Sequence, residues 1–356
     1  MWRWIRRILG GVGLLLTIAA LAGAVYQARA TRRDLSAYPP PGGLVDVGGH
    51  RLHIWCTGTG SPSVVLDTGL GGTAFDWGYV QPAVAEFTHV CSYDRAGMGY
   101  SDSGPGSRTS QQIVREFRAL LDRSGIRGRV ILVGASVGGW NMRLFASTQE
   151  DRVAGLVLVD ARHEEQGDRL LAAGVREAPP RMGLMARLAP AAAYLGIARA
   201  VDFAPGLAPS SVAPSVRPFV QATRFRTSAF ATAADELRHA SQSAEQVKAA
   251  RRRLDLPLVV ISASERGEQS IVEILDGLQR DHLALSKYSC QVIATRSGHV
   301  IAVDQPEIVV DAIRATVAAS RQGTLRPNCD AITPRGSEVS SACEIAGGLT
   351  SACSRM

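Results

Sequence analysis

From residue 44 onward, short apolar runs rich in Val, Ile and Leu alternate with segments whose apolar residues recur at helical spacing. The short runs predict strands, and the spaced segments predict helices with one buried face. We predict strands at residues 44–47, 51–56, 63–67, 89–93, 129–133 and 153–159, and helices at 109–123 and 139–147. The first two strands flank a Gly-Gly pair and predict a hairpin. The alternation favours a mostly parallel central sheet with helices on both faces, an α/β fold.

This rhythm breaks over residues 163–252, a stretch rich in Ala, Pro and Arg that has helical fragments and no convincing strand. It resumes with predicted strands at 258–262 and 291–294 and predicted helices at 271–285 and 306–319. Such an insertion, here after the sixth strand, usually folds as a cap over the ligand end of the sheet. The expected units are a core of 44–162 and 253–321, a helical cap of 163–252, and a polar, cysteine-containing tail of 322–356.

The first 33 residues form a different kind of segment. Residues 8–27 carry no charge, and three arginines precede and three follow this run. About 20 apolar residues, each rising about 1.5 Å, cross a hydrocarbon core of about 30 Å. We expect an uncleaved membrane anchor over 1–33. A signal peptide is the alternative, because Ala-Arg-Ala at 28–30 loosely fits a cleavage site, although the apolar run is longer than usual. A buried core helix fits poorly, since it would have a polar face.

The same segment bears on location. Because the flanking arginines are balanced, the positive-inside rule does not decide the orientation, and the short N-terminal tail favours the N-terminus inside. That arrangement places the body of the protein, joined by a proline-rich linker at 34–43, outside the cytoplasm. We therefore expect a membrane-anchored protein with an extracytoplasmic catalytic domain, or an exported protein if the segment is cleaved.

Composition and charge exclude several classes of protein. With 46% hydrophobic and 20% charged residues in 356 positions, the chain is too apolar to be disordered. Six of its 39 Lys and Arg residues lie in 1–33, which holds no acid, so the remainder carries 33 basic against 32 acidic residues. A nearly neutral body excludes a basic nucleic-acid-binding surface. The six cysteines include no C-x-x-C and no histidine at ligand spacing, so we predict no metal site.

The strongest chemical motif is Gly-Ala-Ser-Val-Gly at residues 134–138, a G-x-S-x-G sequence between a predicted strand and a predicted helix. Small residues around Ser136 permit a tight strand-to-helix turn. Such a turn exposes the hydroxyl at a helix N-terminus, where developing negative charge is stabilised. This context indicates a nucleophilic serine, with a plain glycine turn as the alternative.

At these motifs the chain resembles the α/β-hydrolase superfamily, from about residue 44 to 320. Asp-Thr-Gly-Leu-Gly-Gly at 67–72 follows a strand where the family usually has His-Gly-x-Gly for its oxyanion loop. Residues 93–101 are similar to the family's Y-D-R-x-G-x-G-x-S stretch. Ser-Gly-His at 297–299 follows the last strand, where the family places its catalytic histidine. The resemblance implies the α/β-hydrolase fold and a chain order of serine, acid and histidine.

The nucleophile needs a base within hydrogen-bond reach and an acid to orient that base. Among seven histidines, the position after the last strand makes His299 the best base for Ser136. The acid departs from the family pattern, because the segment after the cap contains no Asp and has Arg266 at about the usual place. The candidate acids, in order of preference, are Asp160 at the end of the strand before the cap, Glu265 and Glu268. A strand-end cap is the alternative role for the first of these.

The resemblance also implies an oxyanion hole formed by the backbone N–H groups of Leu70 and Val137. Thr68 stands where the family usually has a histidine, which leaves both amides in place but changes what supports the loop. The glycines of this loop form a plain turn in the alternative interpretation. We expect Asp94 and Arg95 to form a structural ion pair that braces loops near the site.

The family's strand order implies neighbours for the cysteines. Cys56 and Cys91 lie on adjacent strands in this order. They form one disulfide if the domain is exported. Cys290 and Cys329 lie at the same end of the sheet. The implied pairs are therefore Cys56–Cys91, Cys290–Cys329 and Cys343–Cys353. The alternative for the cysteines within strands is buried, inert thiols.

These observations predict a serine hydrolase that cleaves an ester-type bond of a small or apolar substrate through an acyl-enzyme intermediate, as carboxylesterases and lipases do. A proline-type aminopeptidase or an acyltransferase of the same fold is the first alternative. A non-catalytic ligand-binding member of the superfamily is the second. Serine at position 136 argues against haloalkane dehalogenase or epoxide hydrolase chemistry, which uses a carboxylate nucleophile in this superfamily. No metal or organic cofactor is implied.

Overall fold

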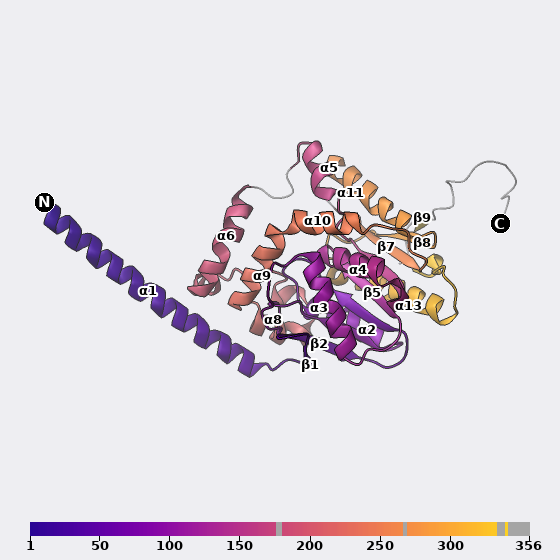
Figure 1. Cartoon of the computed structure of the whole chain (residues 1–356), viewed down its shortest axis with the longest axis horizontal. Helices are drawn as coiled ribbons and strands as arrows, with labels where there is room; N and C mark the ends of the chain where they lie inside the picture. Colours follow the sequence, from indigo (N-terminus) through magenta and orange to yellow (C-terminus); the bar gives the residue numbers. More distant parts are fainter. Residues whose placement is uncertain (176–179, 266–268, 333–338, 341–356) are drawn as a thin grey trace.

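The computed structural model describes residues 1–175, 180–265, 269–332 and 339–340. In this part of the chain, a nine-stranded sheet in the order β1-β2-β4-β3-β5-β6-β7-β8-β9 forms the centre of the molecule (Figure 1). The strands are β1 Gly43–Asp46, β2 Arg51–Thr57, β3 Ser63–Asp67, β4 Val90–Tyr93, β5 Val130–Ala135, β6 Val153–Val159, β7 Leu258–Ala263, β8 Ser289–Ala294 and β9 Val339–Ser340. The pairs β1–β2, β2–β4 and β8–β9 are antiparallel, and the pairs from β4 through β8 are parallel.

Helices precede the sheet, cover its two faces and form the cap. Outside the cap they are α1 Trp2–Ala37, α2 Val80–Ala85, α3 Ser110–Arg123, α4 Val137–Thr148, α11 Gln269–Asp281, α12 Ile301–Asp304 and α13 Pro306–Arg321. Between β6 and β7 they are α5 Gln166–Ala172, α6 Pro180–Tyr194, α7 Ile197–Ala200, α8 Arg217–Thr223, α9 Thr227–Arg238 and α10 Ala240–Ala249. Short 3₁₀ turns lie at Ala74–Trp77, Glu150–Arg152, Pro209–Ser211, Pro214–Val216, His282–Leu285 and Cys329–Ile332.

Two apolar layers hold this architecture together. On one face of the sheet, Phe117 of α3 and Phe145 of α4 pack with Val247 of α10 against the strands. On the other face, Val84 of α2 and Ile313 of α13 do the same. Because both faces are covered, β6 and β7 are buried along their whole length, which explains why they are continuous apolar runs in the sequence. The predicted sheet, its two helical layers and the cap after the sixth strand are confirmed.

Local differences from the predicted elements have simple causes. The helix predicted at 139–147 begins at Val137, because the turn at Ser136 needs no further loop residue. The strand β9 was not predicted, since two residues that pair only through their backbone at the edge of β8 have no periodicity. The expected linker at 34–43 is partly helical, because α1 continues to Ala37.

The helix α1 extends away from the sheet, with the N-terminus of the chain at its far end (Figure 1). Its most apolar window of 18 residues has a mean hydropathy of 2.3, and the helix is long and apolar enough to cross a membrane. Its other end contacts the cap. Gln27 is buried and donates a hydrogen bond from Nε2 to the Phe225 carbonyl at 2.5 Å. Asp34 forms an ion pair with Arg199 at 2.6 Å.

Two disulfides cross-link strands of the sheet to neighbouring segments. Cys56 and Cys91 lie opposite each other on β2 and β4 and are bonded. Cys290 at the start of β8 is bonded to Cys329, which follows α13. Both pairs confirm the expectation from the family resemblance. The third expected pair, Cys343 with Cys353, lies outside the described residues.

Candidate active site

Ser136 occupies a sharp turn between β5 and α4. Its backbone has φ +52° and ψ −122°, a conformation that costs a non-glycine residue about 1–3 kcal/mol and persists only where its surroundings enforce it. The neighbouring glycines allow the close packing that does so. A Cβ on Gly134 would come within 2.7 Å of the Gly138 carbonyl oxygen, and one on Gly138 within 2.6 Å of the Thr68 carbonyl oxygen. A Cβ on Gly139 would lie 2.4 Å from the Ala161 side chain.

Backbone hydrogen bonds fix this turn against the next strand. The Ser136 amide donates to the Val159 carbonyl at 3.2 Å, and the Ser136 carbonyl accepts from the amides of Gly139 at 3.0 Å and Arg162 at 2.9 Å. The serine lies at the wall of a cavity of about 440 Å³. His299, Leu70 and Val137 line the same cavity. Four residues singled out from the sequence are thus brought together around one space.

His299 is held by Asp160. The imidazole Nδ1 lies 2.6 Å from Asp160 Oδ2, and the other carboxylate oxygen accepts from the Ala263 amide at 3.2 Å. The aspartate is 5% exposed at the end of β6, whereas the histidine side chain is 58% exposed on the loop after β8. Because Nδ1 donates to a carboxylate, Nε2 is the ring nitrogen that can accept a proton.

The alternative acids lie elsewhere. Glu265 is exposed after β7, and its backbone amide donates to the Ser297 carbonyl at 3.1 Å, so it helps to shape the loop that carries the histidine. Glu268 lies outside the described residues. Of the described candidates, Asp160 is the acid whose carboxylate contacts the imidazole.

Arg95 organises the loop that carries Leu70. Its guanidinium donates to the carbonyl oxygens of Thr68 and Gly69, both at 2.8 Å. In a trans peptide the C=O of one residue and the N–H of the next point in opposite directions. The Leu70 amide therefore points away from Arg95. Because a Cβ on Gly69 would lie 3.3 Å from the Ser136 Cβ, the loop passes directly over the turn at Ser136.

Buried carboxylates hold Arg95 in this position. It pairs with Asp67 at 2.8 Å, and with Glu236 of the cap helix α9 through Nε and Nη2 at 2.8 and 3.0 Å. Burial disfavours its charge, but the two carboxylates hold the pKa of Arg95 well above its usual range. The sequence motif did not indicate this role, because Glu236 lies far away along the chain.

The expected ion pair between Asp94 and Arg95 is not formed; each residue has other partners. Asp94 accepts from His53 Nδ1 at 2.7 Å and from the amides of Ala74 and Tyr100 at 2.7 and 2.9 Å. The cause is geometric, since successive side chains at the end of a strand point to opposite faces of the sheet. Both residues do brace loops near the site, as predicted. Despite burial, His53 and these amides lower the pKa of Asp94.

Thr68, which stands where the family usually has histidine, is supported by an acid that the sequence did not single out. Its hydroxyl donates to Asp76 Oδ2 at 2.8 Å. Burial raises the pKa of Asp76 to about 6. A Cβ on Gly72 would lie 2.3 Å from the same carboxylate oxygen, so the glycine makes room for this contact. Asp76 also lines the cavity that contains Ser136.

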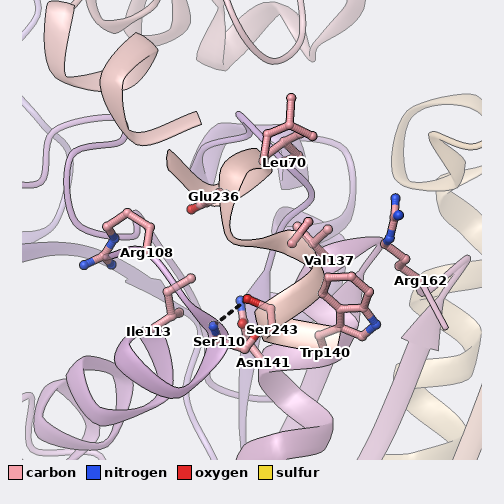
Figure 2. Close-up of a pocket in the computed structure, with 12 residues that line it drawn as sticks. Leu70, Arg108, Ser110, Ile113, Val137, Trp140, Asn141, Arg162, Glu236 and Ser243 are labelled. Carbon is pink, nitrogen blue, oxygen red and sulfur yellow. Dashed lines mark hydrogen bonds between the residues drawn. The ribbon is translucent and has the colours of Figure 1, made fainter. Parts of the chain in front are cut away.

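A second, smaller cavity of about 40 Å³ lies beside the first, and Figure 2 shows the side chains around it. Leu70, Val137 and Arg162 line both cavities, and Trp140 lines the small one with the Arg162 guanidinium above its ring. Residues of α3 and the cap close the far side, where the Ser110 amide donates to Ser243 Oγ at 3.0 Å. The two expected oxyanion-hole residues therefore separate a large space from a small one.

One cluster in the described residues has the composition of a metal site. It comprises Cys56, His89 and Cys91. The two sulfur atoms are joined in a disulfide, so neither is a thiolate that could bind a metal. This cluster is therefore part of the disulfide cross-link between β2 and β4.

Comparison with known proteins places the chain. The sequence model of a protein family described as the alpha/beta hydrolase family matches residues 64–312. Curated relatives match over shorter stretches. A probable transporter efuK of Hormonema carpetanum is 32% identical over 130 residues, 34% of this chain and 19% of that protein. A 2-hydroxy-6-oxononadienedioate/2-hydroxy-6-oxononatrienedioate hydrolase of Burkholderia vietnamiensis is 38% identical over 115 residues, 31% of this chain and 39% of that protein. The matches span half or less of the first curated relatives.

Solved structures cover more of the chain. A putative lipase from Acinetobacter baumannii has a TM-score of 0.58 at 16% identity, covering 84% of this chain and 97% of that one. A thermophilic esterase from Thermogutta terrifontis has a TM-score of 0.54 at 23% identity, covering 76% and 94%. These identities show a shared fold. Since the family model spans more than half of the sequence, the chain belongs to the alpha/beta hydrolase family.

Proposed function

We propose that this protein is a serine hydrolase that cleaves an ester-type bond through an acyl-enzyme intermediate. The observation that carries the proposal is the hydrogen bond between His299 and Asp160 at the wall of the cavity that Ser136 also lines. Ser136, His299 and Asp160 would then be the nucleophile, the base and the orienting acid, and they come from the ends of three different segments. This constellation is recognised by its geometry and roles rather than by sequence position.

Each group has one task. His299 Nε2 takes the proton of the Ser136 hydroxyl while the serine oxygen attacks the ester carbonyl. Asp160 keeps Nδ1 protonated and stabilises the imidazolium. The imidazolium then gives its proton to the departing alcohol, which leaves an acyl group on the serine. Water, deprotonated by the same nitrogen, attacks the acyl carbonyl, and the serine leaves with the proton.

The negative charge on the carbonyl oxygen is stabilised by the Leu70 and Val137 amides. The Val137 amide is the first of α4, whose N-terminus favours negative charge. The Leu70 amide is aimed by Arg95 through the two loop carbonyls. Losing one such donor typically costs about 10²–10³ in kcat. Arg95 is therefore a positioning residue that acts through the loop.

The shape of the site supports an ester with unequal halves. The large cavity has apolar walls from Trp77, Leu207 and Ile301, which suit an apolar chain. The small cavity holds little more than one or two water-sized groups, which suits a short substituent on the other side of the carbonyl. Serine at position 136 supports ester chemistry over the carboxylate-based chemistry of epoxide hydrolases and haloalkane dehalogenases.

We further propose that α1 is a retained membrane anchor. A signal peptidase acting at 28–30 would remove Gln27, which is 3% exposed and hydrogen-bonded to the Phe225 carbonyl of the cap. A helix that completes the fold in this way is better explained as permanent. The two disulfides support a body outside the cytoplasm, where oxidising conditions let them persist. Recovery of the N-terminal peptide from mature, membrane-extracted protein tests this; its absence contradicts retention.

A fluorophosphonate probe tests the catalytic proposal directly, because it reacts with activated serines. Full-length protein in detergent should be labelled, and Ser136→Ala and His299→Ala should not be. His239→Ala, which alters a partly buried histidine of the cap, is the matched control and should label like the wild type. A folded wild type that is not labelled would contradict serine catalysis and favour the non-catalytic, ligand-binding alternative. If the protein hydrolyses peptides that suit a proline-type aminopeptidase but hydrolyses no ester, the aminopeptidase alternative would be favoured.

A further inference from the structure

One edge of the cap exposes an unusual density of large apolar side chains. On α6, Leu184, Met185, Leu188 and Tyr194 are exposed, and the segment that follows exposes Ile197, Val201 and Phe203. We call these seven residues the apolar edge. Soluble surfaces rarely gather so many large apolar side chains on one short stretch unless something covers them.

The apolar edge lies beside α1. The carbonyl oxygen of Leu195, in the turn between α6 and α7, would lie 2.3 Å from a Cβ on Gly23, so the turn packs directly on the helix backbone. Gly196 lies on the same side, with its own Cβ position 3.2 Å from the Gly23 carbonyl oxygen. Figure 1 shows α6 and α1 on the same side of the molecule.

This contact falls within the apolar part of α1. Gly23 belongs to the uncharged run at 8–27, only about 6 Å of helix before the run ends. If the run crosses the bilayer, as proposed above, the turn at Leu195 lies at the boundary of the hydrocarbon core. The apolar side chains on either side of that turn then lie in the interfacial layer, where such side chains are stabilised.

Polar contacts join the cap to α1. Gln27 binds the Phe225 carbonyl through Nε2 and accepts from Arg199 Nε at 3.1 Å, while Arg199 also pairs with Asp34. Exposed arginines lie on α6 and on the part of α1 after Gln27. They are Arg29, Arg32 and Arg33 on α1 and Arg187 on α6. Their charge suits the anionic headgroups of a membrane surface.

We propose that the apolar edge docks into the bilayer that holds α1, and that the active site takes its ester from the membrane. The proposal rests on the serine hydrolase function and the anchor proposed above. The cavity supplies the link, because Gly206 and Leu207, which line it beside Ser136, follow the apolar edge by only a few residues. The substrate class is a membrane-dissolved ester with a long apolar chain, presented from the lipid side of the cap.

Two substrates and a matched variant test this in proteoliposomes of phosphatidylcholine and phosphatidylglycerol. Leu188→Asp and Val201→Asp place charge on the apolar edge. Leu171→Asp is the control, because Leu171 is 64% exposed, against 57% for Leu188, but lies on α5, on the side of the molecule away from α1 (Figure 1). Hydrolysis is measured for a long-chain ester dissolved in the vesicles and for a water-soluble short-chain ester.

The two edge variants should lose about tenfold in turnover of the vesicle ester, the scale of one lost apolar burial, and keep the rate with the soluble ester. Leu171→Asp should change neither rate. Unchanged vesicle turnover in the edge variants overturns the docking proposal, as does an equal loss with both substrates. If the wild type hydrolyses neither ester and takes no fluorophosphonate, the proposed function has failed instead.

A readout independent of activity then still tests docking. A photoactivatable phospholipid in the same vesicles should form adducts on peptides from residues 183–203, and fewer in Leu188→Asp. Cross-links between two copies of α6, without lipid adducts, would assign the apolar edge to a second copy of this chain and overturn the proposal.

Discussion

The rim of the sheet around Ser136 and the cap above it are built in different ways. At the rim, positive-φ backbone at Ser136 and Asp160, tightly packed glycines and short hydrogen bonds leave each group one position. The cap instead is a set of short helices with many exposed apolar side chains. In the function proposed above, the rim determines the chemistry, while the cap determines which substrate reaches Ser136 and from where.

The two regions are joined at a few buried charges. Glu236 of α9 binds Arg95, which in turn binds two carbonyl oxygens of the loop that carries Leu70. Asp235 accepts from the Arg108 amide at 2.7 Å, and Arg108 in turn pairs with Glu116. Removing one partner of a buried ion pair costs about 3–5 kcal/mol, because the other charge stays buried. The cap therefore supports the loop that carries Leu70.

The largest effect should come from the acid of the rim. Asp160→Asn keeps the shape of the contact with His299 but favours the wrong tautomer, so kcat should fall by about 10³–10⁴. Glu265→Gln is the matched control and should stay within about twofold of the wild type, within the scatter of an exposed surface substitution. Steady-state kinetics with a soluble ester measures both. A larger loss in the glutamate variant would make Glu265 the catalytic acid.

The next effect tests the joint between the regions. Arg95→Lys keeps the charge but cannot bond both loop carbonyls and both carboxylates, so the Leu70 amide loses its alignment. We expect kcat to fall by about 10² with KM little changed, because the loop matters most for the transition state. Arg143→Lys, which alters a buried pair with Glu164 and lines neither cavity, is the control for stability. A matching fall in kcat in that variant would show a general effect of the cap.

How far the sequence predicts these two regions depends on the range of the contacts. The strands and Ser136 are predicted because periodicity and a glycine motif are local. Asp160 remains one of several candidates, since nothing local says which strand end reaches the histidine loop. The pairing of Arg95 with Glu236 joins residues 141 positions apart, and the support of Thr68 by Asp76 belongs to no motif. Such contacts exist only once the chain has folded.

A smaller effect should mark the cap as the region that selects substrate. Leu237 of α9 lines the small cavity, and Leu237→Ala enlarges it. We compare kcat/KM for two esters that differ in the length of the group that enters the small cavity. The ratio of the longer to the shorter should rise by about tenfold, the usual scale for one or two methylenes. Fluorophosphonate labelling should keep its rate, and Leu171→Ala should change neither quantity. An altered labelling rate without a shift in preference would place Leu237 in support of the chemistry.

The smallest effect concerns pH and belongs to the rim. Burial raises the pKa of Asp76 from 3.8 to about 6, so the folded protein binds this proton more tightly than the unfolded chain does. The stabilisation of the fold by this bound proton is complete below about pH 4 and is lost as the pH rises through about 6. The unfolding free energy of the wild type relative to Asp76→Asn should therefore fall by about 1–2 kcal/mol over this window, since the site is only partly shielded from water. Denaturant titrations at several pH values measure it, with Glu265→Gln as a control that should follow the wild type. A constant difference between wild type and Asp76→Asn would mean that the carboxyl is ionised throughout, and that Thr68 is held by a carboxylate at every pH.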